Sequence, residues 1–136
     1  MIKNLFISTL FSAAMHSVMG QVPVEVVIRN VQPGKGSVIV GFYSNESTFL
    51  KKPAAGQVRK ADDTVMHFSF NVPSGSYAIA VYQDLNDNKE MDKGLFHIPK
   101  EPYGFSNHYR PGMSAPHFAD CVLPITAPIT ETIEIK

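Results

Sequence analysis

Strict alternation of apolar and polar side chains is the feature that most restricts the fold of this 136-residue chain. Within residues 65–72, every second side chain is large and apolar: Met66, Phe68, Phe70 and Val72. Val24, Val26 and Ile28 alternate with their neighbours in the same way. A period of two is typical of a β-strand that buries one face. Helical periodicity is nearly absent after residue 21, so we expect an all-β protein.

Other segments are expected to complete the sheets. Residues 37–43 (SVIVGFY) are apolar on both faces, which is typical of a central strand. Residues 76–83 follow the turn Pro73-Ser74-Gly75 and are expected to pair back onto the strand at 65–72. The last two strands are expected over residues 118–125 and 129–135.

The connections between these strands are short, polar, or rich in proline and glycine. Residues 45–63 are expected to form a polar loop with a short helical turn near 47–50. No internal repeat and no linker divides the chain. About seven short strands therefore predict one antiparallel β-sandwich domain over residues 21–136.

The first twenty residues have the pattern of a secretory signal peptide. Lys3 supplies the positive start, residues 5–15 form an apolar run, and Val18 and Gly20 are small residues before a predicted cut after Gly20. A membrane anchor is the alternative, but the run is shorter than the ~20 residues that span a bilayer. We therefore expect an exported protein, periplasmic or extracellular, with no membrane span in the mature chain.

Charge and cysteine content exclude several classes of protein. Twelve Lys and Arg balance twelve Asp and Glu, so no basic excess is available to bind nucleic acid. The single cysteine, Cys121, cannot form an internal disulfide. It lies in an apolar stretch, where we expect a small buried thiol.

The segment from Asp84 to Asp92 is unusually rich in oxygen-bearing side chains. Calcium takes six to eight oxygen ligands, and the candidates here are Asp84, Asn86, Asn88, Glu90 (through its carbonyl) and Asp92. An EF-hand is excluded, because Lys89 and Leu95 replace the glycine and glutamate of that loop. The alternative is a structural loop in which Asp and Asn side chains bond the local backbone.

A long segment near residues 93–115 is a second candidate for function. Long loops in small domains are often functional, and the candidate binding residues are Glu101, Tyr103, Phe105 and Asn107. The alternative is that the two aromatic side chains cover one end of the core.

No catalytic motif is recognisable, so we expect a non-enzymatic protein. A hydrolase that uses Glu101, Asp120 or a histidine is the alternative. The histidines at 97, 108 and 117 could bind zinc or copper, although their spacing matches no compact metal motif.

The order of motifs resembles a bacterial exported family, domain of unknown function 2141. The resemblance rests on VPSGSYAIAVYQDLN at residues 72–86, Met91-Asp92, and IPKEPYGFSN at residues 98–107, and it covers about residues 24–135. The Pro-x-Gly-x-Tyr turn is also similar to that of transthyretin-like and collagen-adhesin B-type sandwiches. The resemblance implies an Ig-like or transthyretin-like sandwich and no established activity. In this family the acidic loop usually has Asn-Gly before Lys, whereas Asn88 directly precedes Lys89 here.

These observations predict an exported, non-enzymatic β-sandwich that binds a small ligand or an envelope protein, or has a structural role in the envelope. Its functional end would be formed by residues 84–92 and 101–107. On this hypothesis, Asp84→Ala and Asp92→Ala leave the fold intact and abolish partner binding. A calcium-stabilised module is the alternative.

Overall fold

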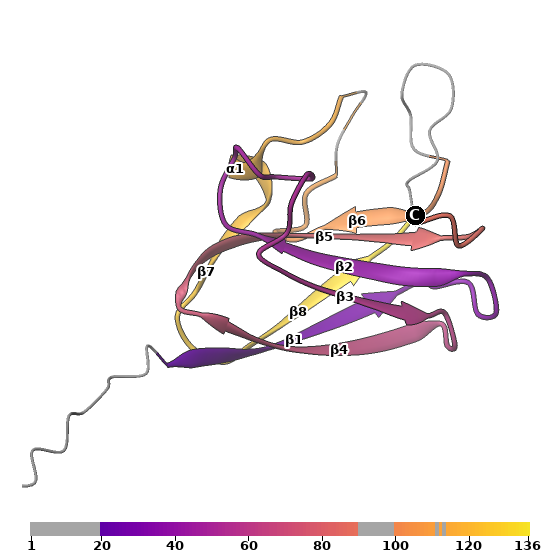
Figure 1. Ribbon diagram of the computed structural model, residues 1–136, viewed down its shortest axis with the longest axis horizontal. Coiled ribbons are helices and arrows are strands. Elements are labelled where there is room, and N and C mark those ends of the chain that lie inside the picture. Colours follow the sequence, from indigo (N-terminus) through magenta and orange to yellow (C-terminus); the bar gives the residue numbers. More distant parts are fainter. Residues whose placement is uncertain (1–19, 90–99, 111, 113) are drawn as a thin grey trace, which may run out of the picture.

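The computed structural model describes residues 20–89, 100–110, 112 and 114–136, which fold into two facing β-sheets (Figure 1). The predicted signal peptide therefore lies outside the described residues, except for Gly20. The elements are β1 (Gln21–Arg29), β2 (Ser37–Tyr43), β3 (Ala55–Lys60), β4 (Val65–Pro73), β5 (Gly75–Asp84), β6 (Tyr103–Phe105), α1 (Phe118–Cys121), β7 (Val122–Ile125) and β8 (Ile129–Glu134). The prediction of an all-β fold is confirmed. No helix among the described residues is long and apolar enough to cross a membrane.

The first sheet has the strand order β4-β1-β8. Strand β1 is antiparallel to β4 but parallel to β8, so the prediction of a purely antiparallel sandwich is wrong. The cause is the last connection. After β7 the chain leaves the second sheet at Pro128 and enters the first sheet in the direction of β1.

The second sheet has the order β3-β2-β5-β6, and β7 also pairs with β5. Strand β2 lies between β3 and β5, as its two apolar faces predict. One edge of β5 is shared by two short strands. Its first residues, from Gly75 to Ala78, pair with β7, and the stretch from Ala80 to Tyr82 pairs with β6.

The predicted hairpin between β4 and β5 is wrong, because these strands belong to different sheets. Only Ser74 separates them, whereas the tightest common hairpin has a two-residue loop. The chain instead crosses from one sheet to the other. The hydroxyl of Tyr77 donates to the carbonyl of Pro73 at 2.7 Å and fastens this crossing.

Three further segments differ from expectation. Residues 118–121 form the short helix α1, because the side chains of Glu46 and Asp120 accept the backbone N–H groups of Phe118 (2.6 Å) and His117 (2.9 Å) at its start. Strand β3 lies within the predicted polar loop, and as an edge strand it buries little and carries a weak pattern. The expected turn near 47–50 is present. Strand β6 lies within the segment expected to be irregular.

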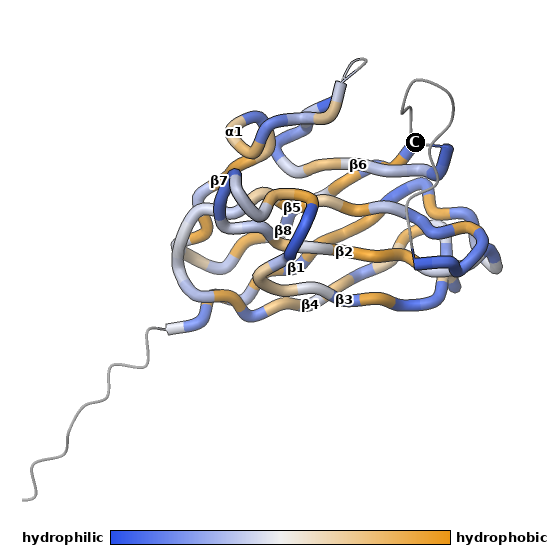
Figure 2. The backbone as a smooth tube through the Cα atoms, turned by 45° about the horizontal axis from the view of Figure 1, so that its top comes forward, coloured by the Kyte–Doolittle hydropathy of each residue, from blue (hydrophilic) through white to orange (hydrophobic). Residues whose placement is uncertain are grey.

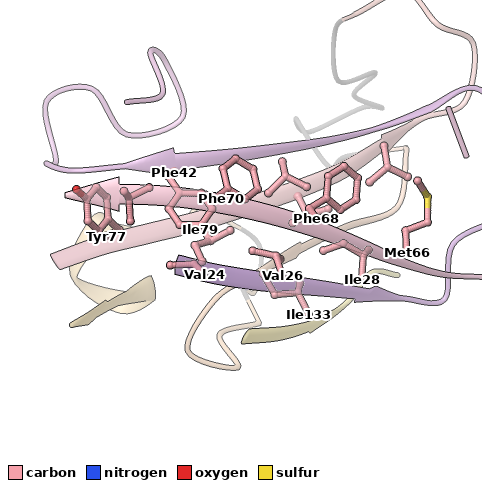
Figure 3. Close-up of a cluster of buried hydrophobic side chains, with 14 of the residues drawn as sticks. Val24, Val26, Ile28, Phe42, Met66, Phe68, Phe70, Tyr77, Ile79 and Ile133 are labelled. Carbon is pink, nitrogen blue, oxygen red and sulfur yellow. The ribbon is translucent and has the colours of Figure 1, made fainter. Parts of the chain in front are cut away.

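The main core lies between the two sheets (Figure 3). The alternating residues of β1 and β4 point into it, as predicted, and Phe42 of β2 packs on Phe70 with ring centroids 4.5 Å apart. Figure 2 shows hydrophobic stretches along the strands and hydrophilic turns at their ends. A second, smaller hydrophobic cluster consists of the buried residues Phe49, Ala78, Phe105 and Cys121.

Long side chains join the sheets on the side where β3 faces β4. Gln57 donates to the carbonyl of Ser69 at 2.6 Å, and Arg59 donates to the carbonyl of His67. The guanidinium carbon of Arg59 also lies 4.8 Å from the ring centre of Phe68. These contacts satisfy backbone carbonyls on the free edge of β4, which would otherwise face solvent unpaired.

Candidate functional site

The acidic loop begins at a buried carboxylate. Asp84, the last residue of β5, is 1% exposed. Its carboxylate accepts the backbone N–H groups of Asn88, at 3.2 Å, and Lys89. The side chain of Asn86 also accepts from the N–H of Asn88 at 3.2 Å. These contacts are those of the structural loop, because Asp and Asn side chains satisfy the local backbone.

The calcium hypothesis stays a prediction. The structure gathers three of its five candidate ligands, Asp84, Asn86 and Asn88, in one tight loop, while Glu90 and Asp92 lie outside the described residues. Within the described ranges, no group of three or more His, Cys, Asp or Glu side chains is arranged to hold a metal ion.

Replacing Asp84 with alanine separates the two interpretations. We expect Asp84→Ala to lower the free energy of unfolding by about 2 kcal/mol, because it removes a charged acceptor of two hydrogen bonds. This replaces the expectation that the variant leaves the fold intact. Denaturant unfolding measures the change, and Asn86→Ala, which removes one exposed acceptor, is the milder control. A calcium site requires instead that millimolar calcium raise the melting temperature of the wild type but not of Asp84→Ala.

The turn between β1 and β2 is fastened to the same end of the sandwich. Gln83 is fully buried and donates to the carbonyls of Gln32, at 2.8 Å, and Lys35, at 2.7 Å. Gly36 has φ +61°, and a Cβ at this position would lie 1.7 Å from the carbonyl oxygen of Asp84. Only glycine allows the two backbones to approach so closely.

The segment that contains the four candidate binding residues is bonded at its start to the end of β5 and to the C-terminal residue. Glu101 is 4% exposed, and its carboxylate accepts the N–H of Leu85 after β5. The backbone N–H and carbonyl of Tyr103 both bond to Lys136 at 3.1 Å, which joins the two sheets beside β8. A Cβ on Gly104 would lie 2.6 Å from Cγ2 of Ile133, so β6 rests directly on β8.

The aromatic pair divides between core and surface. Phe105 is 8% exposed and packs in the second cluster, with its ring centre 6.5 Å from that of Phe49. Tyr103 is half-buried, and its ring meets that of Phe105 edge-on at 5.7 Å. Phe105 thus covers this end of the core, as the alternative interpretation predicts.

Ser106 is a structural residue that sequence reasoning missed. It is fully buried between β6 and β7, where its hydroxyl accepts the N–H of Ile79 at 2.8 Å and donates to the carbonyl of Cys121 at 2.6 Å. Its own N–H donates to the carbonyl of Ile79 at 2.9 Å. Ser106 thereby continues the ladder of β5 across the gap between its two short neighbours.

Cys121 is buried, as expected. Burial, and secondarily the charge of Asp120, raises the pKa of the Cys121 thiol to about 12. The thiol is therefore protonated at neutral pH and is not an activated nucleophile.

The residues considered for catalysis or transition-metal binding are separated. Glu101 bonds near the end of β5, whereas Asp120 lies in α1, just before the strand that pairs with the start of β5. The imidazole of His117 lies 3.4 Å from the carboxylate of Glu46. His108 is near Glu131 instead, and the third histidine, at 97, lies outside the described residues.

A groove of about 400 Å³ opens beside β6 and β8. It brings together the end of β1, strand β6, the segment that follows it, and β8. Its lining is Arg29, Tyr103, Gly104, Phe105, His108, Tyr109, Arg110, Thr132, Ile133, Glu134 and Lys136. Two of the predicted binding residues, Tyr103 and Phe105, line this groove. Sequence reasoning did not identify its basic residues Arg29, Arg110 and Lys136, because they are far apart in the sequence and no local pattern links them.

The wall of the groove is fixed by polar contacts behind it. Burial, and secondarily the nearby charge of Asp120, raises the pKa of Tyr109. Asn107, the fourth predicted binding residue, donates its backbone N–H to Glu131 at 3.3 Å and its side chain to the carbonyl of Asp120 at 3.3 Å. Burial raises the pKa of Glu131, while the Asn107 N–H and the charge of His108 oppose the shift.

A second hollow of similar volume lies at the first sheet, lined by residues of β1, β4 and β8. It is more open than the groove beside β6. Its one ionisable residue is Glu25, so it has fewer charged groups than the first groove with which to bind a ligand.

Comparisons with known proteins place the chain in a family without a known role. The sequence model of a family described as "Uncharacterized protein conserved in bacteria (DUF2141)" matches residues 26–133. No curated protein and no solved structure matches.

Proposed function

Since the chain belongs to the bacterial family DUF2141, whose description names no activity, we propose that it is an exported, non-enzymatic binding module of the cell envelope. The groove beside β6 and β8 is its binding surface. This proposal replaces the acidic loop as the centre of the functional end.

The observation that supports this function is the groove itself. Its volume of about 400 Å³ is within the range of small-molecule sites. Two packed sheets hold its walls, and Gly104 allows β6 to rest directly on β8. Surface segments held by a rigid sandwich are the usual place for recognition.

Two features support a non-enzymatic role. Asp120 and Glu101 lie near opposite ends of β5, and each accepts a backbone N–H. The thiol of Cys121 is buried and protonated.

The crossing at Pro73, fastened by Tyr77, supports the proposed transthyretin-like or Ig-like relationship.

Export is proposed from the pattern of residues 1–20. Strand β1 begins at Gln21, so a cut after Gly20 would remove no residue of the sandwich. If the protein is exported in a bacterial host, mass spectrometry of the periplasmic fraction or the medium will find a chain that starts at Gln21. Finding only the full chain in the cytoplasm would contradict export.

Sedimentation with washed cell envelopes tests the binding role. We expect the protein without residues 1–20 to sediment with envelopes, and the double variant Arg29→Gln/Arg110→Gln to stay in the supernatant. The matched control is Lys52→Gln/Lys60→Gln, which removes two exposed charges beside β3, at the opposite edge of the five-stranded sheet. Equal retention of all three proteins, or no retention of any, would overturn the proposal.

A further inference from the structure

Uncompensated positive charge distinguishes the groove beside β6 and β8. Arg29, Arg110 and Lys136 line it, whereas Glu134 is the one acidic side chain among its lining residues. Across the residues that the structure describes, the side chains of these three cations form no hydrogen bond or ion pair. The fourth basic residue, His108, is engaged with the charge of Glu131. A guanidinium without a partner offers paired donors that match a carboxylate or a phosphate.

The remaining lining residues can contact a ligand ring that carries hydroxyl groups, which a simple inorganic anion lacks. Tyr103 and Tyr109 are half-buried and present both apolar ring surface and a hydroxyl. Glu134 and Thr132 are exposed and can accept hydrogen bonds from hydroxyl groups.

Size and total charge narrow the class of ligand. A volume of about 400 Å³ is more than an inorganic phosphate fills. The chain as a whole has no net charge, which disfavours a nucleic-acid backbone. A small anionic ligand with a ring and hydroxyl groups satisfies the arginines, the tyrosines and Glu134 together.

We propose that this groove binds an anionic saccharide, a sugar ring that carries a carboxylate or a phosphate. The anion contacts Arg29 and Arg110, the ring lies against Tyr103 or Tyr109, and Glu134 accepts from the sugar hydroxyls. This inference rests on the proposed function and specifies its ligand.

An NMR titration tests the ligand class with four probes: glucuronate, glucose 6-phosphate, glucose and inorganic phosphate. We expect both anionic sugars to shift the amide resonances of Gly104, Thr132 and Ile133. Each should bind at least tenfold more tightly than glucose or inorganic phosphate. The glucuronate and glucose 6-phosphate arms separate a carboxylate preference from a phosphate preference.

Variants tie the binding to the groove. Arg29→Gln/Arg110→Gln should weaken binding of the anionic sugars at least tenfold, while Lys52→Gln/Lys60→Gln leaves it unchanged. Thermal melts establish that both double variants are folded.

Each contrary result has a distinct meaning. Equal binding of glucose would overturn recognition of the anion, and equal binding of inorganic phosphate would overturn recognition of the sugar. If no probe shifts the groove resonances while envelopes still retain the protein through the arginines, the ligand class is wrong and the binding function stands. If envelopes fail to retain it as well, both proposals fall.

Discussion

Gly36→Ala is expected to lower the free energy of unfolding by about 4 kcal/mol or to prevent folding. The left-handed backbone of Gly36, with φ +61°, costs a residue with a side chain about 1–2 kcal/mol. The added Cβ would also lie 1.7 Å from the carbonyl oxygen of Asp84. The opposing atoms belong to backbone and cannot turn aside, so overpacking adds about 1–3 kcal/mol. Denaturant unfolding followed by circular dichroism measures the loss.

Gly34 in the same turn provides a matched control. It also has a positive φ, +79°, but a Cβ there would meet nothing within 4 Å. Gly34→Ala should therefore cost only the conformational part, about 1–2 kcal/mol. Equal losses for the two variants would contradict the close approach of Gly36 to the end of β5.

Ser106→Ala is expected to cost about 2–6 kcal/mol of unfolding free energy. The variant leaves the N–H of Ile79 and the carbonyl of Cys121 without their bonds to the hydroxyl. Each unsatisfied buried group costs about 1–3 kcal/mol. Denaturant unfolding measures the total, and native-state hydrogen exchange measures the Ile79 amide, which should lose protection beyond the global change.

Ser76→Ala is the control for this variant. Ser76 lies on β5, the strand of Ile79, but its side chain is exposed, so the change should stay within about 0.5 kcal/mol. If Ser106→Ala is equally mild and the Ile79 amide keeps its protection, the hydroxyl of Ser106 does not link Ile79 to Cys121.

Strands that bury one face could be predicted from the sequence, because their alternation is local. Strands β1 and β4 match their patterns, and the two apolar faces of β2 correctly predicted a central position. The sequence did not reveal β3, since an edge strand buries too little to alternate clearly. The apolar run at residues 118–121 predicts a strand, because a local pattern does not reveal that Glu46, 72 residues away, accepts the N–H of Phe118.

Strand partners were harder to predict than strand positions. A turn sequence such as Pro73-Ser74-Gly75 indicates that the chain bends, but not whether it stays in its sheet. The parallel pairing of β8 with β1 depends on a connection between the sheets. Neither outcome has a local signature, because both depend on which surfaces meet in the folded protein.

The candidate site was predicted only in part for the same reason. The segment from Glu101 to Asn107 was identified by its composition and its family resemblance. Its structural contacts depend on Leu85, Ile79 and Cys121 in other elements. The groove also needs Arg29 from β1, which folding brings beside β6 and β8.

The bonds from Gln57 and Arg59 to the outer carbonyls of β4 affect how this edge can meet a second copy of the protein. A bare strand margin is a template on which a neighbouring molecule can add its own strand, and such addition is the first step toward fibrils. Because the carbonyls of Ser69 and His67 are already engaged within the chain, an added strand would find two of its acceptors on β4 occupied. The contacts that hold the two layers together thus also oppose strand addition at this edge.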